Sequence, residues 1–112
     1  DWDPKPLNNM GGSLGCIYLK FSREVLVVAY QDKHYQRVFS LNTITLQVRE
    51  LYYCNKVGLS VFDDMLIIKN FDKNEYFLFD LHIPLIEKHL CDEEFLKYKQ
   101  ITLHTSDDII KY

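Results

Sequence analysis

The sequence has no cluster of basic residues and no long apolar run. Its 13 Lys and Arg residues are scattered singly among 16 Asp and Glu residues, and the formal net charge is −3. Nucleic-acid-binding domains usually carry a basic patch or stripe, so this distribution argues against a nucleic-acid partner. Apolar runs reach about six residues, far below the roughly 20 that span a bilayer. The sequence therefore predicts no transmembrane segment, and any peripheral membrane association is expected through partner proteins.

The features of a secreted protein are also missing. The start, DWDPKPLNNMGG, lacks the positive charge and apolar core of a signal peptide, and no Asn-x-Ser/Thr sequon occurs. The three cysteines are an odd number and lie far apart, which favours free thiols in a reducing compartment over a disulfide framework. We therefore expect a cytoplasmic protein. Because no initiator Met is present, we also expect an internal piece of a longer chain.

What the sequence does contain is an internal repeat. VLVVAYQDKHYQRVFSL at residues 25–41 aligns without a gap with MLIIKNFDKNEYFLFDL at residues 65–81. Upstream, Ile17, Leu19 and Phe21 fall on Val57, Leu59 and Val61, whereas the match downstream of residue 41 is weaker. Both copies are rich in β-branched and aromatic residues, interrupted by turn-forming residues, which is typical of short strands. Four strands in about 40 residues is the blade period of a β-propeller.

We therefore predict an all-β chain, a β-propeller fragment of about two four-stranded antiparallel blades within one domain over residues 1–112. The blade units span about 16–51 and 57–90, and partial blades are predicted at residues 1–9 and 100–112. The predicted strands are about 16–21, 24–31, 35–41, 44–51, 57–62, 65–70, 75–81 and 84–90. Trp2-Asp3 would close a third strand, and Asp107-Asp108 would repeat the turn at Asp63-Asp64. Residues 91–99 break the pattern as one short helical turn or a loop. A generic antiparallel sandwich is the alternative fold.

Catalytic and metal-binding motifs are not evident in the sequence. His82, His89, Cys91 and Cys54 do not have the spacing of a zinc site, so no metal or cofactor is predicted. Paired carboxylates occur at Asp63-Asp64, Glu93-Glu94 and Asp107-Asp108. Neighbours on a strand point to opposite faces, so these pairs favour solvated turns over acid–base catalysis. We expect a protein that is not an enzyme.

Two recurring turns are the candidate partner contacts, namely Asp32-Lys33-His34 and Asp72-Lys73-Asn74. They occupy equivalent positions in the two copies, so we expect them on the same rim, where loops usually carry recognition. Merely solvated turns are the simpler interpretation. The tyrosines are expected to pack between blades, and any that are exposed become candidate partner anchors. They include Tyr30, Tyr35, Tyr52, Tyr53, Tyr76 and Tyr98.

The period and the strand ends Trp2-Asp3 and Phe79-Asp80 resemble WD40-like propellers, although no Gly-His pair opens the blades and Ser40 replaces the Asp. The stretch 61–81 and the segment ITLHTSDDIIKY are similar to the N-terminal propeller of the Bulli-type subunit of the metazoan Mon–Ccz complex, which activates a late-endosomal Rab GTPase. The matching features are Asp64-Met65-Leu66, Phe79-Asp80 and Asp108-Ile109-Ile110.

This resemblance implies a non-catalytic protein-interaction scaffold in a multi-subunit endolysosomal trafficking complex. Such a protein would be cytoplasmic and peripheral on late endosomes or lysosomes. One alternative is the substrate-receptor propeller of a ubiquitin ligase. Another is a propeller enzyme whose active residues lie outside this segment.

Overall fold

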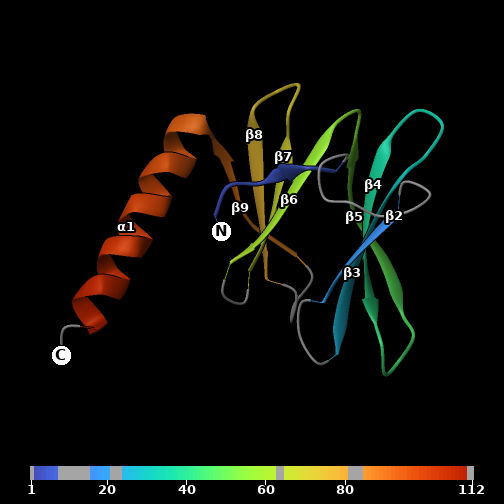
Figure 1. The fold of residues 1–112 in the computed structure, drawn as a ribbon, viewed down its shortest axis with the longest axis horizontal. Helices are drawn as coiled ribbons and strands as arrows, with labels where there is room; N and C mark the ends of the chain where they lie inside the picture. The colour runs from blue at the N-terminus through green and yellow to red at the C-terminus, as the bar shows by residue number, and fades with distance from the viewer. Residues whose placement is uncertain (1, 8–15, 21–23, 63–64, 81–84, 111–112) are drawn as a thin grey trace.

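Two antiparallel sheets and one helix make up the part of the chain that the computed structural model describes, residues 2–7, 16–20, 24–62, 65–80 and 85–110 (Figure 1). The first sheet has the order β2-β3-β4-β5 and the second the order β1-β6-β7-β8-β9. The strands of the first sheet are β2 (Cys16–Lys20), β3 (Val25–Gln31), β4 (Gln36–Asn42) and β5 (Val48–Cys54). Those of the second are β1 (Lys5–Pro6), β6 (Val57–Phe62), β7 (Met65–Asn70), β8 (Glu75–Asp80) and β9 (Leu85–Cys91). Helix α1 (Asp92–Ile110) follows β9.

The antiparallel strands expected from the sequence are confirmed, and β2 to β9 agree with the predicted ranges to within one residue except at β5. That strand begins at Val48 rather than at residue 44 because residues 43–45 form a turn and residues 46 and 47 follow it outside any strand. The side chain of Asn42 accepts the backbone N–H groups of Ile44 and Thr45 at 2.9 and 3.0 Å. Leu46 then adopts a left-handed conformation with a φ of 62°. An Asx turn of this kind competes with strand pairing, so the strand begins later in the sequence.

The two sheets present equivalent faces, which can be matched through their hydrogen-bonding directions. In β3 the even-numbered residues form their backbone hydrogen bonds with β4. The hydrogen bond from the Thr43 N–H to the Glu24 C=O, at 2.8 Å, fixes this alternation. In β7 the hydrogen bond from the Phe71 N–H to the Lys56 C=O, at 3.1 Å, shows that the odd-numbered residues form their backbone hydrogen bonds with β6. The even-numbered residues of β7 therefore form theirs with β8. Chirality fixes a side chain's direction relative to its hydrogen-bonding side. Even-numbered residues of β3 and β7 therefore mark the same face, which we call the front face; the opposite one is the rear face.

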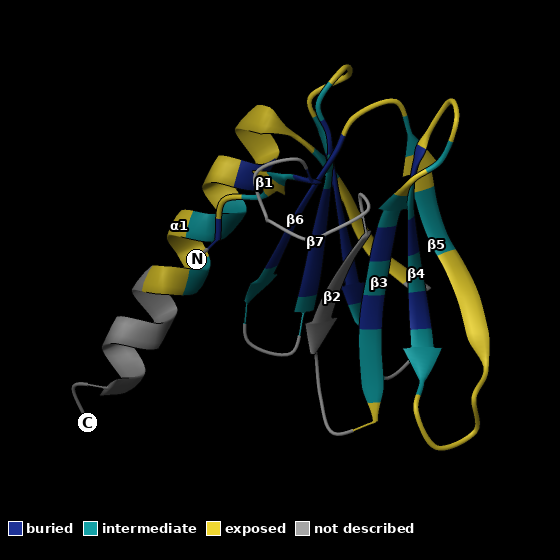
Figure 2. Ribbon diagram, turned by 45° about the vertical axis from the view of Figure 1, so that its right-hand side comes forward, coloured by how far each residue is buried: buried dark blue, intermediate teal, exposed yellow. Residues whose placement is uncertain are grey.

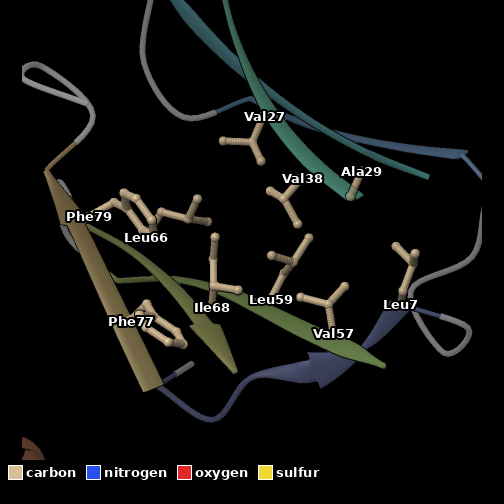
Figure 3. Close-up of a cluster of buried hydrophobic side chains, with 10 residues drawn as sticks. All are labelled: Leu7, Val27, Ala29, Val38, Val57, Leu59, Leu66, Ile68, Phe77 and Phe79. Carbon is tan, nitrogen blue, oxygen red and sulfur yellow. The ribbon is translucent and has the colours of Figure 1, made fainter. Parts of the chain in front are cut away.

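The rear face of the first sheet packs on the front face of the second. Their shared core is drawn in Figure 3 and consists of Leu7, Val27, Ala29, Val38, Val57, Leu59, Leu66, Ile68, Phe77 and Phe79. Val27 and Ala29 come from the rear face of the first sheet, and Leu66 and Ile68 from the front face of the second. Unlike faces meet, so the packing is head-to-tail, as in repeat arrays. A two-fold sandwich would bring like faces together.

The rear face of the second sheet is covered by α1 and by Trp2. Ile67, Tyr76 and Leu78 are buried there together with Trp2 and Phe95. The Phe95 ring stacks on Tyr76 with centroids 4.0 Å apart and planes 3° apart. Figure 2 shows the buried turn of α1 against this sheet and its exposed side toward solvent.

Helix α1 corrects two expectations. The chain is mostly β rather than all-β, and the partial blade expected at 100–112 is wrong over residues 100–110, which are helical. Glu94 helps to start the helix by accepting the Cys91 N–H at 3.0 Å, and this bond lowers the pKa of the Glu94 carboxyl. Three acidic residues in the first turn also suit the positive end of the helix dipole. No helix among the described residues is long and apolar enough to cross a membrane.

The N-terminal segment also differs from its prediction. Lys5 and Pro6 form β1, which pairs antiparallel with Leu59 and Gly58 at the edge of the second sheet. Trp2 and Asp3 lie outside any strand, so they do not close a third strand of a preceding blade. The Trp2 carbonyl instead accepts the Ser60 hydroxyl at 2.9 Å, and its ring stacks on Phe62 at 3.9 Å.

Candidate functional site

A cleft of about 660 Å³ opens where the last strand of the first sheet meets the β7–β8 turn of the second. Figure 1 shows the β3–β4 and β7–β8 turns at the same end of the two sheets, the upper end in that view. We call this end the rim and the opening the rim cleft. Its lining residues are Tyr35, Glu50, Leu51, Tyr52, Tyr53, Cys54, Asn55, Asn70, Asp72 and Lys73. A volume of this size falls in the usual range for binding pockets.

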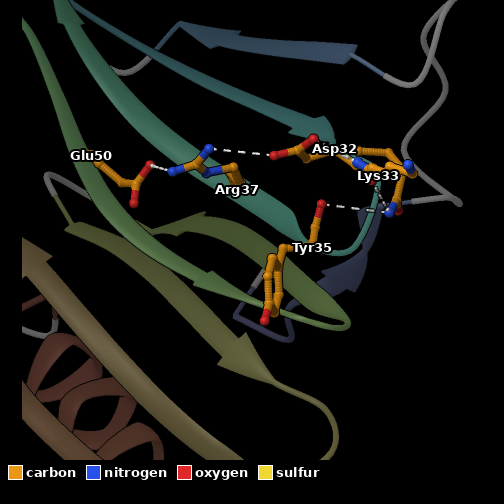
Figure 4. A network of polar contacts seen from close by, with 6 residues as sticks. Asp32, Lys33, Tyr35, Arg37 and Glu50 are labelled. Carbon is orange, nitrogen blue, oxygen red and sulfur yellow. Dashed lines mark hydrogen bonds and ion pairs between the residues drawn. The ribbon is translucent and has the colours of Figure 1, made fainter.

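The β3–β4 turn is held by its own polar residues (Figure 4). Asp32 accepts the backbone N–H of Lys33 at 2.6 Å and forms an ion pair with Arg37 at 3.3 Å. Arg37 also pairs with Glu50 on β5 at 2.7 Å, which connects the turn to the wall of the cleft. Lys33 and His34 are exposed. Of this predicted contact turn, Asp32 has a structural role, whereas the His34 ring lies edge to face with Tyr35 at 6.4 Å.

The β7–β8 turn contributes directly to the cleft. The Asn70 side chain accepts the N–H groups of Asp72 and Lys73 at 3.0 and 3.2 Å, and it donates to the Tyr52 hydroxyl at 2.9 Å. Asn74 takes the left-handed conformation with a φ of 52°, which Asn tolerates better than most residues. Of the six predicted contact residues, only Asp72 and Lys73 line the cleft, while Asp32, Lys33, His34 and Asn74 lie on the turns beside it.

Two exposed tyrosines form the outer wall of the cleft. Tyr35 and Tyr53 are 43% and 54% exposed, and their rings meet edge to face at 5.4 Å. Tyr52 instead packs on Phe77 at 4.5 Å, so it belongs to the core, as expected for most strand tyrosines. In the sequence, Tyr35 and Tyr53 are named among six tyrosines, and the pattern does not distinguish the exposed ones from the packed ones. The available signal was that Tyr35 directly follows a recurring turn.

A buried glutamine joins the two sheets next to the cleft. Gln36 is 3% exposed, and its carbonyl oxygen accepts the backbone N–H of Val57 at 2.7 Å. Its amide donates to the side chain of Gln31 at 2.9 Å. Since both ends of the buried amide are bonded, the rim has a fixed geometry there.

The thiol on the cleft is poorly suited to nucleophilic chemistry. Burial raises the pKa of Cys54 to about 11, and the thiol donates a hydrogen bond to the Lys56 carbonyl at 3.2 Å. Cys54 is therefore a neutral thiol at physiological pH, whereas the reactive form is the thiolate. The cleft offers phenol rings, hydroxyls, amides and one charge of each sign beside the Arg37–Glu50 pair. Such groups suit recognition of another molecule.

The remaining sequence candidates lie elsewhere or beyond the described residues. His89 stacks on Phe77 at 4.4 Å and is 3.5 Å from Glu75, while Cys91 is exposed at the end of β9. Within the described ranges no group of three His, Cys, Asp or Glu residues could hold a metal ion. His82 and the Asp63-Asp64 turn lie outside the described residues. Asp107-Asp108, expected in a turn, falls within α1.

Comparison of the chain with protein-family models, with curated proteins and with solved structures finds no match. The resemblances to WD40-like propellers and to the Bulli-type subunit therefore stay predictions.

Proposed function

We propose that this chain is a segment of a β-propeller-type array and acts as a non-catalytic protein-interaction scaffold, with the rim cleft as a partner site. The observation that carries the proposal is the cleft itself, where one recurring turn and two exposed tyrosines meet on a rigid two-sheet frame. Loops on such a frame commonly carry recognition, and Tyr is enriched among interface hot spots.

The propeller part of the proposal is supported by the packing of the sheets. Two meanders of four strands follow each other in sequence and stack with unlike faces in contact. Consecutive blades of a propeller are repeated units related in this way. On the rear face of the second sheet, α1 takes the place that the next unit of a longer array would occupy.

The test compares two pairs of exposed side chains on the immobilised chain. Tyr35→Ala with Tyr53→Ala removes the outer wall of the cleft. Ile44→Ala with Val48→Ala is the matched control, because Ile44 and Val48 are 69% and 65% exposed and lie in the β4–β5 turn and at the start of β5, away from the cleft end of that strand. We expect proteins captured from cell extract by the wild type and the control to be lost from the cleft variant, and loss of binding with Lys73→Glu as well.

Equal capture by the cleft and control variants would refute the cleft as the partner site. The identity of a captured partner separates the two forms of the scaffold proposal. Subunits of a Rab exchange complex would support the endolysosomal role, and subunits of a ubiquitin ligase would support the substrate-receptor role.

A further inference from the structure

We infer that the front face of the first sheet is an interface for a third antiparallel sheet of the same repeat. This inference rests on the repeat frame of the proposed function, but not on the rim cleft. In the part of the chain that the structure describes, the first sheet stands at the end of the stack opposite α1 (Figure 1).

Equivalent residues of the two front faces differ in burial. Leu66 and Ile68 on the front face of the second sheet are completely buried, at 0% exposure. Their equivalents Leu26 and Val28 on the front face of the first sheet are only half-buried. The side-chain types are nearly the same, so the difference arises from what lies on each face. The second front face is covered by a sheet.

The composition of the first front face suits a buried interface. Its middle is apolar, with Leu26, Val28 and Leu41 around Phe39, whose ring stacks on Tyr30 at 5.6 Å. Among the residues of β3, β4 and β5 on this face, the charged ones are Arg37 and Glu50; they pair with each other, and Arg37 also pairs with Asp32. A paired charge is far less unfavourable in an interface than a single one.

The internal contact between the sheets indicates what the occupant looks like. The bulky front face of the second sheet is met by Val27, Ala29 and Val38, small side chains that let the two sheets approach closely. We therefore expect the occupant of the first front face to be a sheet whose facing residues are small and apolar.

A second copy of this chain does not offer such a face. The rear face of its first sheet lies in its own core, and the rear face of its second sheet is covered by α1 and Trp2. A helix is also a poor match, because α1 packs on a rear face and not on a front face.

The experiment supplies a third sheet within one molecule. A second copy of residues 16–56 is fused ahead of the intact chain through a Gly/Ser linker of about 30 residues, which spans up to about 100 Å. That length exceeds the 47 Å long axis of the molecule. Docking of the added sheet at high effective concentration should raise Tm by about 5 °C or more.

Val28→Lys then tests where the added sheet docks. In the intact chain's own copy it places an ammonium group under the new sheet, and the gain in Tm should disappear. In the added copy the same substitution lies on the front face of the added sheet, which no further sheet covers. The gain in Tm should therefore remain. In the unfused chain Val28→Lys should change Tm by less than about 2 °C. Val28→Thr repeats the comparison with a milder change if a lysine variant does not fold.

Three results would overturn the inference. One is a fused chain whose Tm is no higher than that of the unfused chain. Another is a gain in Tm that Val28→Lys reduces equally whether it is placed in the intact chain or in the added copy. The third is a dimer of the unfused chain, seen by sedimentation and dispersed by Val28→Lys, which would make a second copy the occupant. If the rim-cleft variants keep their partners while the Tm gain holds, only the proposed cleft function fails, so the two ideas are separable.

Discussion

Phe95→Ala should detach α1 from the second sheet and strongly destabilise the protein. Phe95 is 4% exposed and stacks on Tyr76, with Trp2 edge-on at 6.4 Å. Truncation of a buried Phe to Ala typically lowers the free energy of unfolding by about 3–5 kcal/mol. We expect about 3–4 kcal/mol here, because α1 lies at the edge of the molecule and can partly close the space. That is a large share of the roughly 5–15 kcal/mol that stabilises a typical domain.

Urea unfolding followed by far-UV circular dichroism measures this change. With an m-value of about 1.5 kcal/mol per molar, the midpoint should fall by roughly 2 M. Leu96→Ala is the matched control, since the neighbouring Leu96 is 52% exposed and its loss should shift stability by about 0.5 kcal/mol at most. Phe95→Leu should fall between them, because it keeps apolar volume but loses the aromatic stacking on Tyr76. If Phe95→Ala and Leu96→Ala unfold at the same urea concentration, the proposed docking of α1 is wrong.

Three further predictions concern the core, the inter-sheet bond and the thiol. Val27→Asp or Ile67→Asp places a charge at a position with 0% exposure, so either should lower stability by more than about 4 kcal/mol and remove soluble protein, whereas Val48→Asp should not. Gln36→Ala leaves the Val57 N–H without its acceptor and should lower the unfolding free energy by about 1–3 kcal/mol; an unchanged calorimetric Tm would contradict that role. At pH 8, iodoacetamide should modify Cys54 about 100-fold more slowly than an ordinary thiol, since its pKa is about 11 instead of 9.0. Because the pKa of Cys54 is higher in the folded chain than in the unfolded chain, its contribution to the free energy of unfolding is fully present below pH 9 and is lost as the pH rises toward 11. Modification of Cys54 as fast as of the exposed Cys91 would refute the burial of Cys54.

The strands were predictable because the signal is local. Apolar and aromatic runs alternate with turn residues every few positions, and each turn sets the pairing of the strands beside it. The register between the two copies was harder to predict. Val57 pairs with Asn70 as Cys16 pairs with Tyr30, so Val57 is the structural equivalent of Cys16 and not of Ile17. A one-residue slip exchanges the faces of a strand, and an alignment of apolar residues does not detect it.

The helix and the cleft were not predictable because both depend on distant contacts. Ile101 and Thr102 are β-branched, which favoured a strand, yet the segment is helical. The helix is docked by Phe95 on Tyr76 and Trp2, residues far away in sequence. The exposure of Tyr35 and Tyr53 likewise depends on how the two sheets stack. Local patterns contain no information about either arrangement.

The position of α1 also bears on how copies of the chain behave toward one another. A front face at one end and a rear face at the other are the two unlike surfaces of a head-to-tail stack, and such a pair on one molecule can join identical copies into an open filament when the contact does not close a ring. Because α1 and Trp2 cover the rear face, only one of the two surfaces is available in each copy. We therefore expect α1 to block this contact between copies, and a chain whose α1 has come loose, as in Phe95→Ala, should scatter light increasingly with concentration.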